Sequence, residues 1–192
     1  MRCFLAVEIP DEICAALARL QQELRRATTL RVRWADPATF HLTLKFLGDT
    51  SAEQHDRLVA LLADPVAARG ALGIELAGAG AFPPGRRPRT IWAGVVRGGE
   101  ALAALADAVD RAAAAVGFPR ETRPFHPHVT LGRVRAPRPA PDLVAALEER
   151  RTVPLGAWTP AAVTLVESRL GPGGARHRPI RQWPFGARES AS

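Results

Sequence analysis

Two short stretches of the sequence repeat one pattern of residue types that can carry out acid–base chemistry. The first is HLTLKFLG, beginning at His41, and the second is HVTLGRVR, beginning at His128. Both contain His-x-Thr-Leu, although the chain has only five histidines among 192 residues. The repetition leads to the hypothesis that the two stretches are the two halves of one active site.

Each motif is predicted to lie on a strand that presents its histidine and threonine on one face. Between residues 40 and 46 apolar residues alternate with polar ones, which is typical of a half-buried strand. His41, Thr43 and Lys45 therefore share the polar face of the first motif, and His128 and Thr130 share that of the second. A single such pair is more often structural, because threonine suits strands for its β-branching alone, but two copies favour function.

Two facing imidazoles could act on one phosphorus atom without a metal ion. A histidine side chain with a pKa near ~6.5 can take a proton when neutral and give one when charged. One imidazole could activate water while the other protonates a departing oxygen. The threonine hydroxyls could donate hydrogen bonds to the phosphate oxygens and stabilise charge in the transition state.

The elements that would position these motifs follow one order in both halves of the chain, with a midpoint near residues 90 to 100. This order indicates an internal duplication, with two lobes of sheet and helix around a cleft. Hydrophobic periodicity and breaker residues predict strands at 2–9, 40–46, 71–82, 90–96, 126–134, 161–170 and 178–185, and helices at 13–24, 51–62, 100–118 and 142–150.

Composition is that of an ordinary globular domain, with 47% hydrophobic and 23% charged residues. No apolar run approaches the length of a membrane span, and acidic residues interrupt the first apolar run, so a cytoplasmic location is expected.

Cys3 and Cys14 are too few for a disulfide framework and are expected to be buried apolar side chains. The net charge of +7 favours an anionic partner such as RNA, although arginine-rich composition alone also explains it.

Other residues offer further candidates. His126 and His128 form an H-x-H that could bind a metal, but no acidic residue nearby completes a ligand set, so His126 is expected to line the cleft. Trp34 and Phe46 could stack on a nucleobase, although the alternation places Phe46 on the apolar face. His55 is expected on the surface of a helix. The basic segments 86–89 and 132–138 could guide an RNA backbone or be solvated loops.

The motifs and their surroundings resemble a known family, over roughly residues 2 to 186. FLAVEIP, HLTLKFLG, RPFHPHVTLGR and LVESRLGPGGARHRPI together are similar to the RNA 2′,3′-cyclic phosphodiesterases of the ThpR (LigT-like) type, formerly described as RNA 2′-5′ ligases, in the 2H phosphoesterase superfamily. The resemblance implies an α+β fold that is bilobal and pseudo-twofold, with two antiparallel sheets flanked by helices around a central cleft. Residues 1–186 would form this single domain, followed by a flexible tail at 187–192.

The resemblance also implies an activity and a role for each site residue. The enzyme would hydrolyse RNA 2′,3′-cyclic phosphate ends to 2′-phosphomonoesters as a monomer, without a metal or cofactor. His41 would protonate the departing 3′ oxygen and His128 would activate water. Thr43 and Thr130 would hold the phosphate, with Arg133 as an extra contact.

One departure from the family and three other interpretations stay open. Relatives commonly carry a tyrosine where this chain has His177, which leaves any tyrosine-dependent contact in doubt. The alternatives to the hydrolase are a non-catalytic RNA or nucleotide phosphate-binding module and a metal-dependent hydrolase that uses His126 and His128. Joining of 2′ and 5′ RNA ends is reachable through the same groups in vitro.

Overall fold

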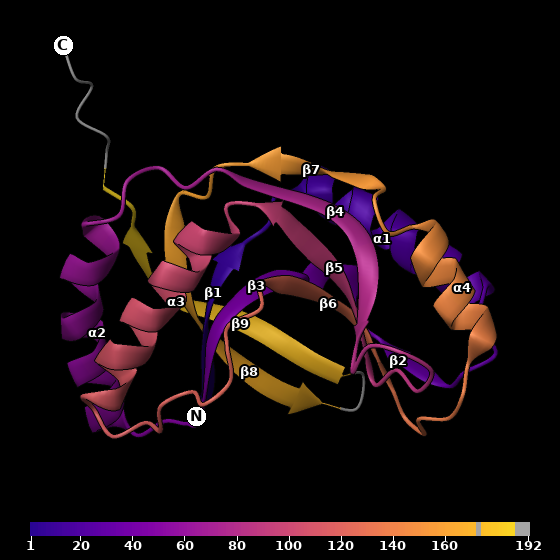
Figure 1. The fold of residues 1–192 in the computed structure, drawn as a ribbon. Coiled ribbons are helices and arrows are strands. Elements are labelled where there is room, and N and C mark those ends of the chain that lie inside the picture. Colours follow the sequence, from indigo (N-terminus) through magenta and orange to yellow (C-terminus); the bar gives the residue numbers. More distant parts are fainter. Residues whose placement is uncertain (172–173, 187–192) are drawn as a thin grey trace, which may run out of the picture.

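The computed structural model describes residues 1–171 and 174–186, so the expected tail at 187–192 lies outside the described residues. The fold is α+β, as expected, and Figure 1 shows one pair of helices at each end of a curled sheet. The elements in order are β1 (Arg2–Glu8), α1 (Asp11–Arg26), β2 (Val32–Trp34), η1 (Pro37–Thr39), β3 (His41–Asp49), α2 (Ala52–Ala67), β4 (Ile74–Phe82), β5 (Thr90–Arg97), α3 (Gly99–Ala114), β6 (His128–Val134), α4 (Pro141–Glu149), β7 (Pro154–Trp158), β8 (Ala162–Gly171) and β9 (Gly174–Pro184).

The strands form one antiparallel sheet that is symmetric about the two motif strands. Its order is β7-β4-β5-β6-β3-β1-β8-β9, and β2 pairs with β6 beside this path. The halves β7-β4-β5-β6 and β3-β1-β8-β9 correspond to the two expected antiparallel sheets, which are joined here through β3 and β6. The pseudo-twofold relation therefore exchanges β3 with β6, the strands that carry the two motifs.

Each half of the sheet has its own helices and its own hydrophobic core. Helices α2 and α3 pack against one half, and α1 and α4 pack against the other (Figure 1). The predicted apolar face of α1 is confirmed, because Leu17 and Leu24 are fully buried. A capping box is present at the start of α2, with Ser51 accepting from the Gln54 N–H and the Gln54 side chain accepting from the Ser51 N–H. Among the described residues, no helix is long and apolar enough to cross a membrane.

The two motif strands touch at one point and then diverge. Their only paired residues in the described ladder are Leu42 and Val129, both fully buried. Beyond this pair, β6 pairs with β2 instead of β3, and Arg33 of β2 lies opposite Arg133. The short strand β2 was not predicted, because three residues give too little periodicity to recognise. The divergence of β3 from β6 leaves room for a cleft between the two halves of the sheet.

A β-bulge at the leucine of each motif changes the alternation that the sequence suggests. In β3 the register with β1 skips Leu44, and in β6 the register with β5 skips Leu131. Each bulge shifts the alternation of side chains by one residue. Phe46 and Arg133, the second residue after each bulge, therefore return to the face that carries the histidine and threonine of their motif.

The same bulge turns Lys45 away from the polar face on which the sequence placed it. Its side chain is buried between β3 and α3, where Nζ lies 2.6 Å from Asp110 Oδ1 and donates to the Pro119 carbonyl at 2.8 Å. A buried ammonium group requires such partners because desolvation of an unpaired charge costs several kcal/mol. The pair therefore connects the first motif strand to the segment that leads into the second.

Gln21 of α1 supports the bulge of the second motif from beneath. Its side chain is 7% exposed, and Nε2 donates to the carbonyls of Ala35 and Leu131 at 2.8 and 2.9 Å. A buried carbonyl group that loses its donor keeps its desolvation cost. Gln21 thus donates hydrogen bonds to two backbone carbonyls where β2, β6 and α1 meet, at the point where the bulge begins.

Replacing Gln21 by Leu is expected to lower the free energy of unfolding by about 1–3 kcal/mol, because the Ala35 carbonyl would lose its side-chain donor and the Leu131 carbonyl would keep only the Ala35 N–H. Urea unfolding followed by circular dichroism measures this change. Gln22→Leu is the matched control, since Gln22 is the exposed neighbour on the same helix, and it should change stability by less than about 0.5 kcal/mol. Equal effects of the two substitutions would contradict the supporting role of Gln21.

Candidate active site

The single pair between the motif strands brings the two motifs together on one face. In an antiparallel ladder, the register Leu42–Val129 places His41 opposite Thr130 and Thr43 opposite His128. These four side chains are partly buried, whereas the intervening Leu42 and Val129 are fully buried on the helix-covered side. The histidine of each motif therefore lies beside the threonine of the other.

Both motif histidines are fixed by the same local hydrogen bond. His41 Nδ1 lies 2.7 Å from the Thr39 carbonyl oxygen, and His128 Nδ1 lies 2.7 Å from the His126 carbonyl oxygen. A carbonyl oxygen can only accept, so Nδ1 carries the hydrogen in each ring. The Nε2 atom of each ring is then free to accept a proton when the ring is neutral, or to donate one when it is charged.

Aromatic side chains surround His41. Its ring stacks on Phe4 of β1 with the centroids 4.5 Å apart, and it meets His177 of β9 edge-on with the centroids 5.1 Å apart. His177 also contacts Phe4 edge-on at 4.9 Å. The imidazole of His177 thus packs directly against the first motif histidine.

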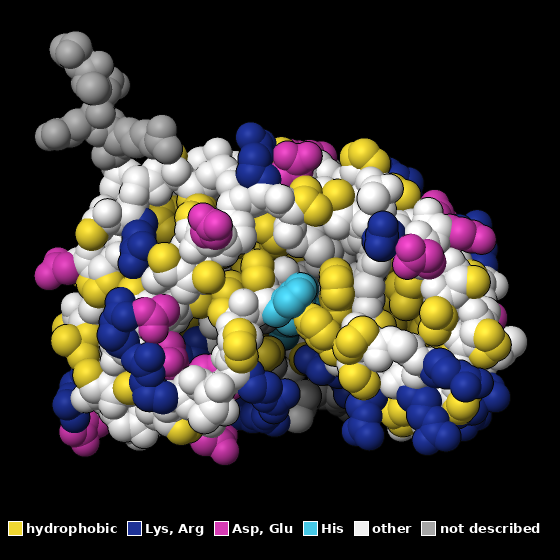
Figure 2. Space-filling model, viewed as in Figure 1, with side chains coloured by type: hydrophobic (Ala, Val, Ile, Leu, Met, Phe, Trp, Pro, Cys, Tyr) yellow, Lys and Arg dark blue, Asp and Glu magenta, His cyan; other side chains and the backbone are white. Residues whose placement is uncertain are grey.

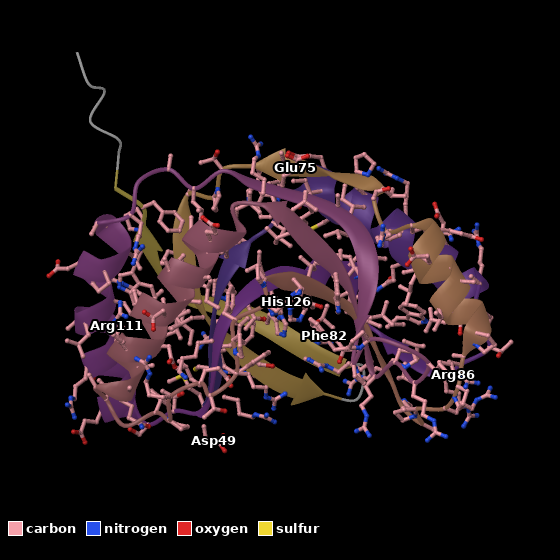
Figure 3. The ribbon with its side chains drawn as sticks, in the orientation of Figure 1. Asp49, Glu75, Phe82, Arg86, Arg111 and His126 are labelled. Atoms are coloured by element: carbon pink, nitrogen blue, oxygen red, sulfur yellow. The ribbon has the colours of Figure 1, made fainter. Side chains whose placement is uncertain are left out.

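His128 has a corresponding aromatic environment on the other half of the sheet. Phe82 contacts both His128 and His126 edge-on, with the ring centroids 5.2 and 5.0 Å apart, and Trp92 lies 5.4 Å from His126. Figure 3 shows Phe82 and His126 close together near the middle of the molecule. His126 therefore lies beside the second motif, but it is not among the residues that line the cleft described below, so the prediction that it lines the cleft was wrong.

Burial keeps both motif histidines neutral at physiological pH in the free protein. Desolvation lowers the pKa of His41 to about 4, opposed by its hydrogen bond to Thr39 and assisted by the nearby charges of His177 and His128. Desolvation also lowers the pKa of His128, again opposed by its backbone hydrogen bond to His126.

A cleft of about 1190 Å³ opens where β3 and β6 diverge. His41, Thr43, Thr130 and Arg133 all line it, whereas His128 is not among its lining residues. The register of the motif strands sets His128 opposite Thr43, which lines the cleft. Figure 2 shows histidine side chains at the centre of this face of the molecule. A second cavity, of about 550 Å³ between α2 and α3, is lined by no histidine.

The bulges overturn the prediction for Phe46 and account for the position of Arg133. Phe46 was predicted to face the core, but its side chain is 66% exposed and lines the cleft, because the bulge at Leu44 reverses its direction. Trp34 also lines the cleft, as expected for a residue that could stack on a base. Arg133 lies on the cleft side as well, and its side chain donates to the Thr90 hydroxyl at 3.3 Å.

The remaining candidates lie farther from the motifs or lack partners. His55 is on α2, as predicted, but its side chain is only 22% exposed, and Nδ1 lies 2.8 Å from Asp56. Within the described residues, no three His, Cys, Asp or Glu side chains converge as metal ligands, and the pair His126 and His128 has no third member there. Cys3 is buried and Cys14 is partly buried, and both are free thiols.

Comparison with known proteins identifies the family. The model of the 2′-5′ RNA ligase superfamily matches residues 9–172. The chain belongs to this superfamily. Within it, a protein of Aeropyrum pernix named RNA 2′,3′-cyclic phosphodiesterase is 36% identical over 80% of this chain and 86% of its own length. The protein of the same name from Methanothermobacter thermautotrophicus is 32% identical over 91% of this chain and 93% of its own length.

Solved structures of the superfamily have the same fold. A protein of Thermus thermophilus superposes with a TM-score of 0.79 at 28% identity, covering 98% of this chain and 100% of its own. Escherichia coli LigT in complex with 3′-AMP superposes with a TM-score of 0.75 at 26% identity, covering 96% and 97% of the two chains. The bilobal 2H phosphoesterase fold implied by the family resemblance is therefore confirmed.

Several residues that shape the site were not predicted from the sequence. Phe4 and Phe82 lie on strands whose pattern is simply apolar, and nothing in their spacing shows that they contact the histidines. Gln21 interrupts the apolar face of α1, and a polar residue at such a position is the one signal that could have indicated a buried hydrogen-bonding role.

The low pKa of His41 predicts a pH dependence of stability. The unfolded chain would protonate His41 near pH 6.5, whereas the folded protein would do so only near pH 4. Between these values the unfolded state binds more protons, so stability falls as the pH decreases through this window. His41→Phe removes the titrating group, so the loss of free energy of unfolding between pH 7 and pH 4.5 should be smaller than in the wild type. Equal losses, measured by urea unfolding at each pH, would contradict the burial of a neutral imidazole.

Proposed function

We propose that this protein hydrolyses 2′,3′-cyclic phosphate ends of RNA to 2′-phosphomonoesters. The observation that carries the proposal is the register of the motif strands, which sets an imidazole beside a hydroxyl in each of two symmetric positions on one face. The names of the curated relatives, which are RNA 2′,3′-cyclic phosphodiesterases, support the choice of substrate.

The proposed reaction is an in-line displacement at phosphorus. His128 Nε2 takes a proton from a water molecule whose oxygen attacks the phosphorus atom. The bond between phosphorus and the 3′ oxygen breaks, and His41 gives the proton of its Nε2 to that oxygen. The products are a 2′-phosphomonoester and a free 3′ hydroxyl, and the two histidines return to their starting states by proton exchange with solvent. The choice of His41 as acid and His128 as base rests on the family resemblance.

Three further side chains are proposed to hold the phosphate. Thr43 and Thr130 line the cleft beside the histidines, where each hydroxyl can donate to a non-bridging oxygen as negative charge develops. Arg133 lies on the same face beyond the bulge, and its guanidinium group can form paired hydrogen bonds with phosphate oxygens. Five side chains from two strands would thus surround one phosphate group.

Binding of the anionic substrate is proposed to promote protonation of His41 by solvent. Desolvation lowers the pKa of His41 to about 4 in the free protein, so the ring is neutral at pH 7. A phosphodiester anion placed beside the ring favours its charged form and raises this pKa. Anion binding and protonation of His41 are therefore coupled, and the acid form is populated mainly in the substrate complex.

Histidine substitutions in the presence of a chelator test the proposed catalysis. With an RNA oligonucleotide ending in a 2′,3′-cyclic phosphate, the wild-type protein is expected to form a 2′-phosphate end in EDTA as well as without it. His41→Ala and His128→Ala should each reduce kcat/KM by about 10²- to 10⁴-fold, because each removes a positioned acid or base. The end group is identified by chromatography of the products.

His55→Ala is the control for this experiment, because His55 lies on α2 outside the cleft and should leave kcat/KM nearly unchanged. Loss of activity in EDTA would instead favour a metal-dependent hydrolase. Salt-sensitive RNA binding without any product would favour a non-catalytic binding module and would overturn the proposal.

The coupling between anion binding and protonation predicts that binding takes up a proton. His128→Ala protein should bind a 2′,3′-cyclic mononucleotide more tightly as the pH falls from 8 to 6, because the charge of this ligand is constant in that range. Calorimetry in buffers of different ionisation enthalpy measures the uptake, which should disappear when His41→Phe is added. An affinity that is independent of pH would contradict the proposed protonation of His41.

A further inference from the structure

Four arginines form two facing pairs on the ribbon of β2 and β6. Arg33 lies directly opposite Arg133 in the register of these strands. The next pair on the same face is Arg31 and Arg135, in which the Arg135 N–H donates to the Arg31 carbonyl at 3.0 Å. All four side chains are exposed. These four residues are called the arginine ladder below.

Like charges in directly opposite positions destabilise a pair of strands. Such pairs are usually relieved by a nearby carboxylate, but no member of the arginine ladder forms an ion pair within the described part of the chain. Asp36 lines the same cleft, but its carboxylate accepts from the Ala38 N–H at the start of η1. The ladder therefore concentrates positive charge that the protein itself leaves uncompensated.

The arginine ladder extends away from the candidate site along β2 and β6. Arg133 is at its inner end on the motif strand, and Arg33 and Arg135 line the same cleft as His41. Successive pairs on a strand face are about 6–7 Å apart. Figure 2 shows Lys and Arg side chains gathered along the lower edge of the molecule, including the region of β2. A chain of negative groups could thus extend from the site along this ribbon.

We propose that the arginine ladder binds the backbone phosphates of an RNA strand on the 5′ side of its cyclic end. This inference rests on the proposed function and specifies the substrate as an oligonucleotide rather than a cyclic mononucleotide. A 2′,3′-cyclic phosphate stands at the 3′ end of its strand, so every further phosphate lies on the 5′ side. With the cyclic phosphate at the motifs, those phosphates meet Arg33, Arg135 and then Arg31, whereas a mononucleotide has no group that reaches them.

The test compares two substrates in one triple variant, Arg31→Gln, Arg33→Gln and Arg135→Gln. For an oligonucleotide of six residues with a cyclic phosphate end, KM should rise about tenfold or more, with kcat nearly unchanged, because phosphate contacts contribute affinity and not chemistry. For a cyclic mononucleotide, kcat/KM should change less than twofold. The dependence of log Kd for the oligonucleotide product on log[salt] should become shallower by about 2, which corresponds to about 0.7 for each of three lost contacts.

A matched control removes the same charge elsewhere. Arg57, Arg97 and Arg151 are exposed and each pairs with a glutamate, so the triple glutamine variant at these positions changes the net charge equally. It should leave KM for both substrates nearly unchanged. Equal effects of the two triple variants would show a general charge effect and overturn the ladder as a binding track. The same holds if the ladder variant affects the mononucleotide as strongly as the oligonucleotide.

Failure of the ladder inference and failure of the proposed function give different results. If the wild-type protein hydrolyses neither substrate, the proposed function is wrong. If it hydrolyses both with the same kcat/KM and the ladder variant does so too, the proposed function stands and the ladder is not part of RNA binding.

Discussion

The site depends on one contact between two strands that are far apart in the sequence. Leu42 and Val129 form the pair that joins the two halves of the sheet, and both are fully buried. Because side chains alternate across a strand, a shift of this register by one residue would turn one motif toward the helices. The geometry of both imidazoles therefore follows from hydrophobic burial on the opposite face, and two separate cores hold the two halves in place.

Hydrophobic periodicity was sufficient to predict the motif strands and the helices, because their periods are long and regular, whereas the fold class was implied by the resemblance to a known family. It failed where a bulge interrupts the period. The direction of Phe46 and the burial of Lys45 both depend on the extra residue at Leu44. A bulge is set by the pairing with the neighbouring strand, which one strand's pattern does not contain. A bulge in β6 likewise turns Arg133 toward the cleft. The wrong predictions for Phe46 and Lys45 and the correct one for Arg133 therefore have the same kind of cause.

The side chains that surround the histidines also could not be predicted from the sequence, because they come from several different strands. Phe4, Phe82 and His177 come from β1, β4 and β9, and they lower the polarity around the two rings. Such surroundings keep the imidazoles neutral until an anion enters. Positive charge is supplied by arginines on β2 and β6, of which Arg33, Arg133 and Arg135 line the same cleft as His41. The cleft thus combines apolar walls at the reacting group with cationic side chains along the path that leads to it.

A crystal structure with a bound nucleoside 2′-phosphate tests most directly whether both imidazoles serve one phosphorus atom. The expected result has His41 Nε2 and His128 Nε2 within about 3.2 Å of oxygen atoms on the same phosphate or of the adjacent 3′ hydroxyl. Thr43 and Thr130 should donate to that phosphate as well. A phosphate group bound by one motif alone, with the other imidazole turned away from it, would contradict a shared site and with it the proposed reaction.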